Sequence, residues 1–140
     1  MADRANLYIT VHADKKQFAS EMSKLLAEYG EEVTEAVKKA VPVVAKEATE
    51  EIRKHAPVSN NPKRSGKYKK AITLRRNEET NTSIKYVIWA GEEAHLSHLL
   101  ENGHAKVNGK GRTKAIPHFK YGETYANENL IPEIIKKIGG

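Results

Sequence analysis

The chain of 140 residues contains no cysteine, few aromatic residues and no long hydrophobic run. Without cysteine it cannot form disulfides, thiolate zinc sites or iron–sulfur clusters, and it has no cysteine nucleophile. Its longest uncharged apolar run, Ala40 to Ala45, is interrupted by Pro42, whereas a transmembrane helix needs about 20 apolar residues. The first residues mix acid and base without an apolar segment, so we expect no secretory signal. We therefore expect a soluble, intracellular protein with a single domain over 1–140.

Positive charge is concentrated in two segments, although the whole chain carries a net charge of only +6. Residues 55–76 contain seven basic residues and no acidic one, and residues 104–122 contain five basic residues and no acidic one. Residues 77–103, between them, contain five acidic residues and one basic residue. Such segments can contact a polyanion such as DNA, can serve as solvated loops, or can pair with acidic surfaces of neighbouring copies. Composition alone favours solvated loops.

The first residues alternate in polarity as expected for a short strand with one buried face. Leu7, Ile9 and Val11 alternate with polar or amphipathic side chains. Asp14 is placed to cap a following helix. We therefore interpret residues 1–14 as an N-terminal strand or arm.

Apolar residues then recur every three or four positions over 18–52, which is the period of an amphipathic helix. We expect helices over 15–29 and 31–55, and Pro42 should kink the second one. A helix of that length runs the full width of a compact domain of this size. Few later residues are available to cover its apolar stripe, so we expect neighbouring copies to complete it.

The second half of the sequence predicts a β-hairpin, two further helices and two basic loops. The hairpin strands and the helices are expected over 71–76, 83–90, 95–101 and 119–137. Proline, glycine and lysine mark the loops, a mobile one over 56–70 and a second one over 104–116. The fold class is therefore α+β, with a long, kinked amphipathic helix packed on a small antiparallel sheet, a short helix and a C-terminal helix.

Four histidines, His95, His98, His104 and His118, are candidate metal ligands. The first two lie within one helical turn, and three imidazoles with a water would form a hydrolytic zinc site. The H-E-x-x-H, G-x-G-x-x-G, G-x-S-x-G and P-loop patterns are all missing from the sequence. Surface or capping histidines are the more common interpretation, and we expect no metal, no cofactor and no enzymatic activity.

Two stretches of the chain carry a recognisable signature. The first joins Ala56 to Val58 with Arg64 to Ile72, and the second joins His98 to Ala105 with Gly109 to Arg112 and with Pro117-His118. In this order and spacing, and with the helices on either side, residues 30–138 resemble small head–tail junction proteins of long-tailed bacteriophages.

The chain departs from that family's pattern in three places. The first loop is enlarged by Ser59 to Pro62, and Ser65 stands where threonine is usual. Residues 119–122 replace a proline–alanine pair at the end of the second stretch. These departures affect the details of the loops.

The resemblance implies a structural virion protein that acts at the head–tail joint and occurs in the host cytoplasm during assembly. Its implied partners are its own copies in a ring, other neck, connector or tail-tube proteins, and DNA passing through the channel, with no membrane. The family motif then has structural roles. Gly66 would allow a tight turn, Leu99 and Leu100 would bury the short helix, Gly103 would take a positive φ, and Pro117 would start the last helix. The motif residues are Pro57, Gly66, Leu99, Leu100, Glu101, Gly103, His104 and Pro117.

On this interpretation the two basic loops face acidic surfaces of neighbouring subunits or DNA in the lumen. The candidate residues are Lys63, Arg64, Lys67, Lys69, Lys70, Lys106, Lys110, Arg112 and Lys114. An independent small nucleic-acid-binding module that uses the same loops is the alternative, and a histidine-ligated metal protein is a third hypothesis.

Overall fold

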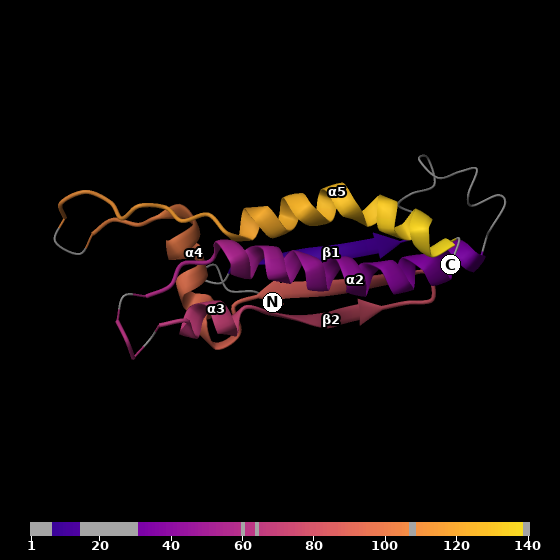
Figure 1. Cartoon of the computed structure of the whole chain (residues 1–140), viewed down its shortest axis with the longest axis horizontal. Helices are drawn as coiled ribbons and strands as arrows, with labels where there is room; N and C mark the ends of the chain where they lie inside the picture. Colours follow the sequence, from indigo (N-terminus) through magenta and orange to yellow (C-terminus); the bar gives the residue numbers. More distant parts are fainter. Residues whose placement is uncertain (1–6, 15–30, 60, 64, 107–108, 139–140) are drawn as a thin grey trace.

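The computed structural model describes residues 7–14, 31–59, 61–63, 65–106 and 109–138. Two long helices, α2 (Glu31–His55) and α5 (Phe119–Ile138), pack side by side against a three-stranded sheet (Figure 1). The molecule is elongated along these helices. The predicted α+β class is confirmed, as are helices over 31–55 and from residue 119. The helix expected over 15–29 lies outside the described residues.

Helix α2 supplies most of the core. It continues through Pro42, and its apolar stripe faces the sheet and α5. The residues of this stripe are each at most 1 % exposed: Val33, Ala36, Val37, Ala40, Val41, Val44, Ala45, Ala48 and Ile52. The expectation that neighbouring copies complete the stripe is therefore wrong over the described residues. The cover comes from α5, whose looser apolar pattern still places Phe119, Ala126 and Ile134 against the core.

Close packing between the two helices depends on a glycine. A Cβ on Gly122 of α5 would lie 2.5 Å from the Ile52 side chain and 3.0 Å from the Ala48 carbonyl oxygen of α2. Both α2 residues are fully buried. The absence of a side chain at this position therefore lets α5 approach α2 closely enough to cover its stripe.

The sheet has the order β1-β3-β2 and is antiparallel throughout. Its strands are β1 (Tyr8–Asp14), β2 (Thr73–Glu79) and β3 (Ser83–Trp89). Ile9 and Val11 of β1 are buried, as their alternation predicts. Strand β2 is displaced from the predicted 71–76, because the ladder with β3 extends into the expected turn and pairs Glu78 with Lys85. A bulge between Arg76 and Glu78 accommodates this extension.

One of the two short helices was not predicted, and the other was. The segment predicted as a loop over 56–70 ends in helix α3 (Lys67–Ala71), which follows Gly66 in the left-handed conformation (φ 76°). Helix α4 (Ala94–Asn102) has the expected position, and Gly103 after it has the expected positive φ of 73°. Leu99 was expected to bury α4, but 38 % of it is exposed. Leu100 is partly buried, in agreement with the prediction, as is Leu96, and Ser97 is fully buried.

The two basic segments lie at the same end of the molecule. The described residues of segments 56–66 and 103–118, together with α3 and α4, form one end of the long axis, which we call the loop end (Figure 1). The beginning of α2, the end of α5 and the β2–β3 turn lie toward the opposite end. Segments separated by about 40 residues in sequence thus form one surface.

Candidate interaction site at the loop end

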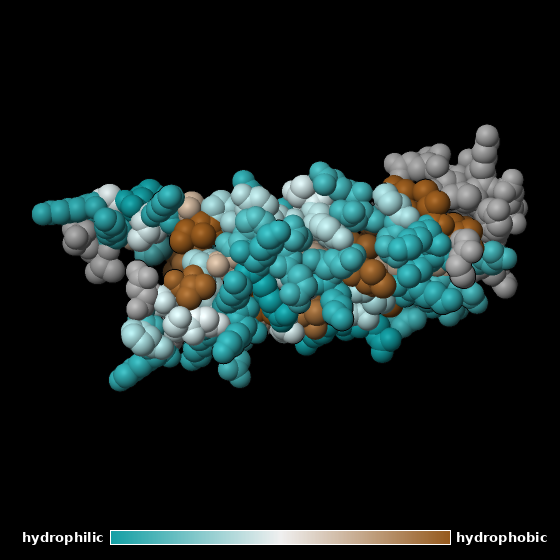
Figure 2. Space-filling view, viewed as in Figure 1, coloured by the Kyte–Doolittle hydropathy of each residue, from teal (hydrophilic) through white to brown (hydrophobic). Residues whose placement is uncertain are grey.

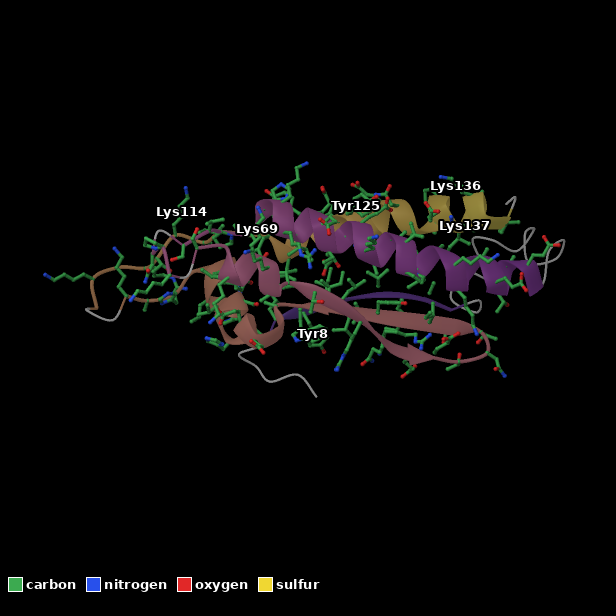
Figure 3. The ribbon with its side chains drawn as sticks, turned by 60° about the horizontal axis from the view of Figure 1, so that its bottom comes forward. Tyr8, Lys69, Lys114, Tyr125, Lys136 and Lys137 are labelled. Carbon is green, nitrogen blue, oxygen red and sulfur yellow. The ribbon has the colours of Figure 1, made fainter. Side chains whose placement is uncertain are left out.

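The loop end carries eight of the nine basic residues predicted from the sequence. Arg64 is the ninth, and it lies outside the described residues. Lys69 is half-buried and the other basic side chains are exposed: Lys63, Lys67, Lys70, Lys106, Lys110, Arg112 and Lys114. Figure 3 shows Lys69 and Lys114 toward this end, and Lys136 and Lys137 of α5 toward the other. The sequence predicted the two basic loops, but it did not predict that they lie at the same end of the molecule.

The described residues of the second basic segment form a two-stranded arm. Ala105 and Arg112 form an antiparallel bridge, and the Lys106 N–H donates to the Gly111 carbonyl oxygen (2.9 Å). At its base the Thr113 N–H donates to the His104 carbonyl oxygen (2.7 Å). The Arg112 guanidinium donates to the Gly103 carbonyl oxygen (3.1 Å). Arg112 therefore stabilises the arm as well as contributing charge.

A buried hydrogen-bond network joins the first basic segment to the rest of the loop end. The Tyr68 hydroxyl of α3 lies 2.6 Å from His118 Nε2 and 2.9 Å from Ser97 Oγ of α4. All three residues are at least 93 % buried. Lys67 beside Tyr68 approaches the buried Glu93 carboxylate at 3.8 Å. The first basic segment is thus held in place by a tyrosine that sequence reasoning assigned to a mobile loop.

Both titratable members of this network are neutral at neutral pH. Burial lowers the pKa of His118, and burial raises the pKa of Tyr68 to about 12. His118 Nδ1 faces the Ile116 carbonyl oxygen at 2.8 Å, so the ring proton resides on Nδ1. Nε2 is then the acceptor, and the Tyr68 hydroxyl is its donor.

Glu101 caps the last helix from the end of α4. Its carboxylate accepts the backbone N–H groups of His118 (3.0 Å), Phe119 (2.9 Å) and Lys120 (3.3 Å). These donors have no partners within the helix, and a negative charge at the helix N-terminus is stabilising. Pro117 was expected to start this helix, but α5 begins at Phe119 and its first turn is held by Glu101.

An apolar groove of about 370 Å³ opens at the loop end. Its lining residues come from the first segment, α3, α4 and the approach to α5: Pro57, Val58, Ser59, Tyr68, Leu96, Leu100 and Ile116. Val58 is 52 % exposed and Ile116 is 37 % exposed. Figure 2 shows hydrophobic surface at this end between hydrophilic projections. The loop end therefore offers both positive charge and an apolar contact surface.

The described residues do not form a metal centre. No three histidine, aspartate or glutamate side chains among them are grouped so that they could hold a metal ion. The candidate histidines have separate environments, since His98 contacts Asn102, His104 Nδ1 faces the Ala105 carbonyl oxygen, and His118 belongs to the buried network. In the same part of the chain, no helix has both the length and the apolar character needed to cross a bilayer.

The fold and the loop end define a small α+β domain that presents a basic and partly apolar surface for interaction. A protein-family model described as "Bacteriophage HK97-gp10, putative tail-component" matches residues 16–103, which is more than half of the chain. The chain therefore belongs to the HK97-gp10-like family of phage tail components, and it is a structural protein of the virion. No curated protein and no solved structure matches the chain significantly.

The match confirms the family predicted from the two signature stretches. It includes α2, the first basic segment and α4, and it ends at Gly103. The sequence did not reveal Ser97 or the pairing of Tyr68 with His118. Tyr68, Glu101 and His118 all lie within the signature stretches, and this is the signal in the sequence that points to them. Their spacing does not show that Tyr68 contacts His118 or that Glu101 caps the last helix.

Proposed function

We propose that this tail component completes the joint between the head and the tail of the phage particle. It acts without catalysis at the head–tail junction, as a ring of its own copies in contact with other neck, connector or tail-tube proteins. The protein would collect in the host cytoplasm during assembly and remain in the finished virion.

The observation that carries this proposal is the gathering of both basic segments at one end of an elongated body. Toward the opposite end the charges are mixed, since exposed carboxylates such as Glu32 and Glu78 accompany basic residues such as Lys136. A body with positive charge gathered at one end can be oriented by an acidic neighbour, because complementary charges fix register and suppress wrong pairings. The apolar stripe of α2 is already buried within the chain, so we assign assembly to the loop end.

The experiment is deletion of the gene from the phage, followed by electron microscopy of the lysate. We expect filled heads and free tails in place of complete particles, and a plasmid copy of the wild-type gene should restore attachment. Infectious, properly joined particles from the deletion phage would overturn the proposal.

The same loop end supports a second candidate, an independent nucleic-acid-binding module. Its two-stranded arm carries exposed Lys106 and Arg112 and projects from the body (Figure 1). A salt series with short duplex DNA separates the candidates. Sub-micromolar binding that weakens steeply with salt would favour the nucleic-acid module, because affinity for the phosphate backbone depends on counterion release.

A further inference from the structure

The apolar groove at the loop end is open to solvent, although burial of its apolar side chains would be favourable. Its floor is formed by Tyr68, Leu96 and Leu100, and its rim carries Val58 and Ile116. Leaving such side chains in water is unfavourable by about 25 cal/mol for each Å² of apolar surface. A volume of about 370 Å³ is at the small end of the range for binding pockets, and it suits one or two side chains.

The surroundings of the groove are positively charged. Tyr68 is flanked in sequence by Lys67 and Lys69, and Lys114 lies two residues before Ile116. The carboxylates of this end are largely engaged, since Glu101 caps α5 and Glu93 is buried. Among the described residues of segments 56–71 and 91–118, Glu92 is the one carboxylate side chain that is exposed. An occupant of the groove therefore meets apolar walls at an end of the molecule that is rich in exposed lysines.

We propose that this groove binds a segment of another virion protein in which an apolar side chain is flanked by carboxylates. The apolar side chain fills the groove, and the carboxylates face the exposed lysines of the loop end. The acidic flanks select the partner and orient it, while burial of the apolar anchor supplies affinity. The assignment of the partner to the virion rests on the proposed function, whereas the recognition chemistry rests on the groove.

Judged on the residues that the structure describes, a second copy of this chain is a poorer fit than a different protein. Among the described residues, the large exposed apolar side chain at the far end is Ile135 (49 % exposed), which is followed in sequence by Lys136 and Lys137. Those positive charges would repel the lysines of the loop end. The exposed carboxylates of the β2–β3 hairpin, Glu78 and Glu79, have only polar neighbours in sequence and offer no apolar anchor.

Fluorescence anisotropy with three labelled peptides of equal length tests the recognition chemistry. One peptide carries leucines flanked by glutamates, the second replaces the leucines by serine, and the third replaces the glutamates by lysine. We expect the first peptide to bind at least about tenfold more tightly than either control. It alone has both the apolar side chains that fill the groove and the carboxylates that face the lysines.

Surface variants test whether the groove is the binding site. Val58→Asp and Ile116→Asp place a carboxylate on the rim, and each should weaken binding of the acidic peptide at least about tenfold. Ile135→Asp is the matched control, because Ile135 is similarly exposed but lies on α5 toward the other end. It should leave binding unchanged. Thermal melts should show that all three variants remain folded, since each changes an exposed side chain.

Several outcomes would overturn the proposal. Equal binding of the lysine-containing peptide, or binding that neither rim variant weakens, would show that the groove does not recognise acidic, apolar segments. Duplex DNA or phosphatidylglycerol vesicles that bind more tightly than the acidic peptide, and are equally weakened by Ile116→Asp, would assign the groove to a polyanion or a lipid surface.

Phage complementation separates this proposal from the proposed function. Ile116→Asp should fail to restore tail attachment to the deletion phage, and Ile135→Asp should restore it. If Ile116→Asp restores attachment, the groove proposal is wrong and the head–tail function stands. If the deletion phage joins heads to tails without the protein, the proposed function is wrong, and the virion partner is wrong with it.

Discussion

Tyr68 and His118 share a buried hydrogen bond of 2.6 Å although 50 residues separate them in sequence. This bond connects α3, which carries part of the basic surface, to the start of α5. Ser97 of α4 bonds the same phenol oxygen, and Glu101 of α4 caps α5. The signature residues of the chain thus connect three helices at the loop end, and their role is to hold the interaction surface in shape.

Removal of the tyrosine hydroxyl should destabilise the protein. Tyr68→Phe leaves the buried Nε2 of His118 without a donor, and an unsatisfied buried group of this kind costs about 1–3 kcal/mol. The measurement is the free energy of unfolding from urea titrations. Tyr121→Phe is the control, because Tyr121 is 40 % exposed, and its change should stay within about 0.5 kcal/mol. Equal stability of the two variants would contradict the network.

The Glu101 cap should contribute to the stability of α5 through its charge. Glu101→Gln keeps the size of the side chain but weakens its attraction for the helix N-terminus, which should cost about 1–2 kcal/mol. Hydrogen exchange should accelerate first at the amides of Phe119 and Lys120. Glu128→Gln, an exposed change within the same helix, is the control. Unchanged exchange at those two amides would exclude a capping role.

Stability should fall below pH 6.5 because of His118. Burial lowers the pKa of His118 below its ordinary value of 6.5. This effect outweighs the Ile116 carbonyl and the Glu101 carboxylate, both of which raise the pKa. The unfolded chain then takes up a proton near pH 6.5 that the folded chain takes up only at lower pH. The contribution of His118 is therefore fully present above pH 6.5 and is lost as the pH falls toward the folded-state pKa.

The measurement is the free energy of unfolding against pH for the wild type and for His118→Gln. The wild type should lose up to about 1.4 kcal/mol more per pH unit than the variant in this window. The comparison of slopes isolates His118, because the other titrating groups are common to both proteins. Parallel curves would contradict the buried, neutral imidazole.

Much of the architecture could be predicted because local patterns determine it. The period of apolar residues predicted helix α2 at 31–55, and the glycine after α4 predicted its end. The error about the apolar stripe of α2 arose from the weak pattern of α5. Pro132 and scattered polar residues obscure its period, and Gly122 makes no visible contribution to a hydrophobic face although it allows the closest contact.

The candidate site was less predictable, because it depends on contacts between distant segments. Lysines mark a basic loop, but only the three-dimensional structure brings residues 63–70 and 106–114 to one end. Tyr68 lies among basic residues in a segment with prolines and asparagines, which is typical of a loop, and its burial depends on His118 and Ser97. Such pairings leave no periodic signal in one sequence.

The contact between α2 and α5 predicts that Gly122→Ala is destabilising. Alanine favours a helix over glycine by about 1 kcal/mol, but its Cβ would meet the Ile52 side chain at 2.5 Å. Ile52 is fully buried and has little room to move. The cost of overpacking, about 1–3 kcal/mol, should therefore exceed the gain in helix propensity. In a double-mutant cycle, Ile52→Val should recover part of the loss. Independent, additive effects would contradict the close contact.

Reversal of charge on the second basic segment should abolish assembly without unfolding the protein. Lys106 and Lys114 are exposed, so Lys106→Glu with Lys114→Glu should change the free energy of unfolding by about 1 kcal/mol or less. Complementation of the deletion phage should nevertheless yield mostly free tails, because carboxylates at these positions repel an acidic partner surface.

The control for this pair is Lys136→Glu, an exposed change on α5 toward the opposite end (Figure 3). It should restore attachment to the wild-type level. Electron microscopy counts of joined and unjoined particles give the readout for both variants. If the double variant also restores full attachment, the charge of the arm has no part in joining, and the second basic segment serves only as solvated surface.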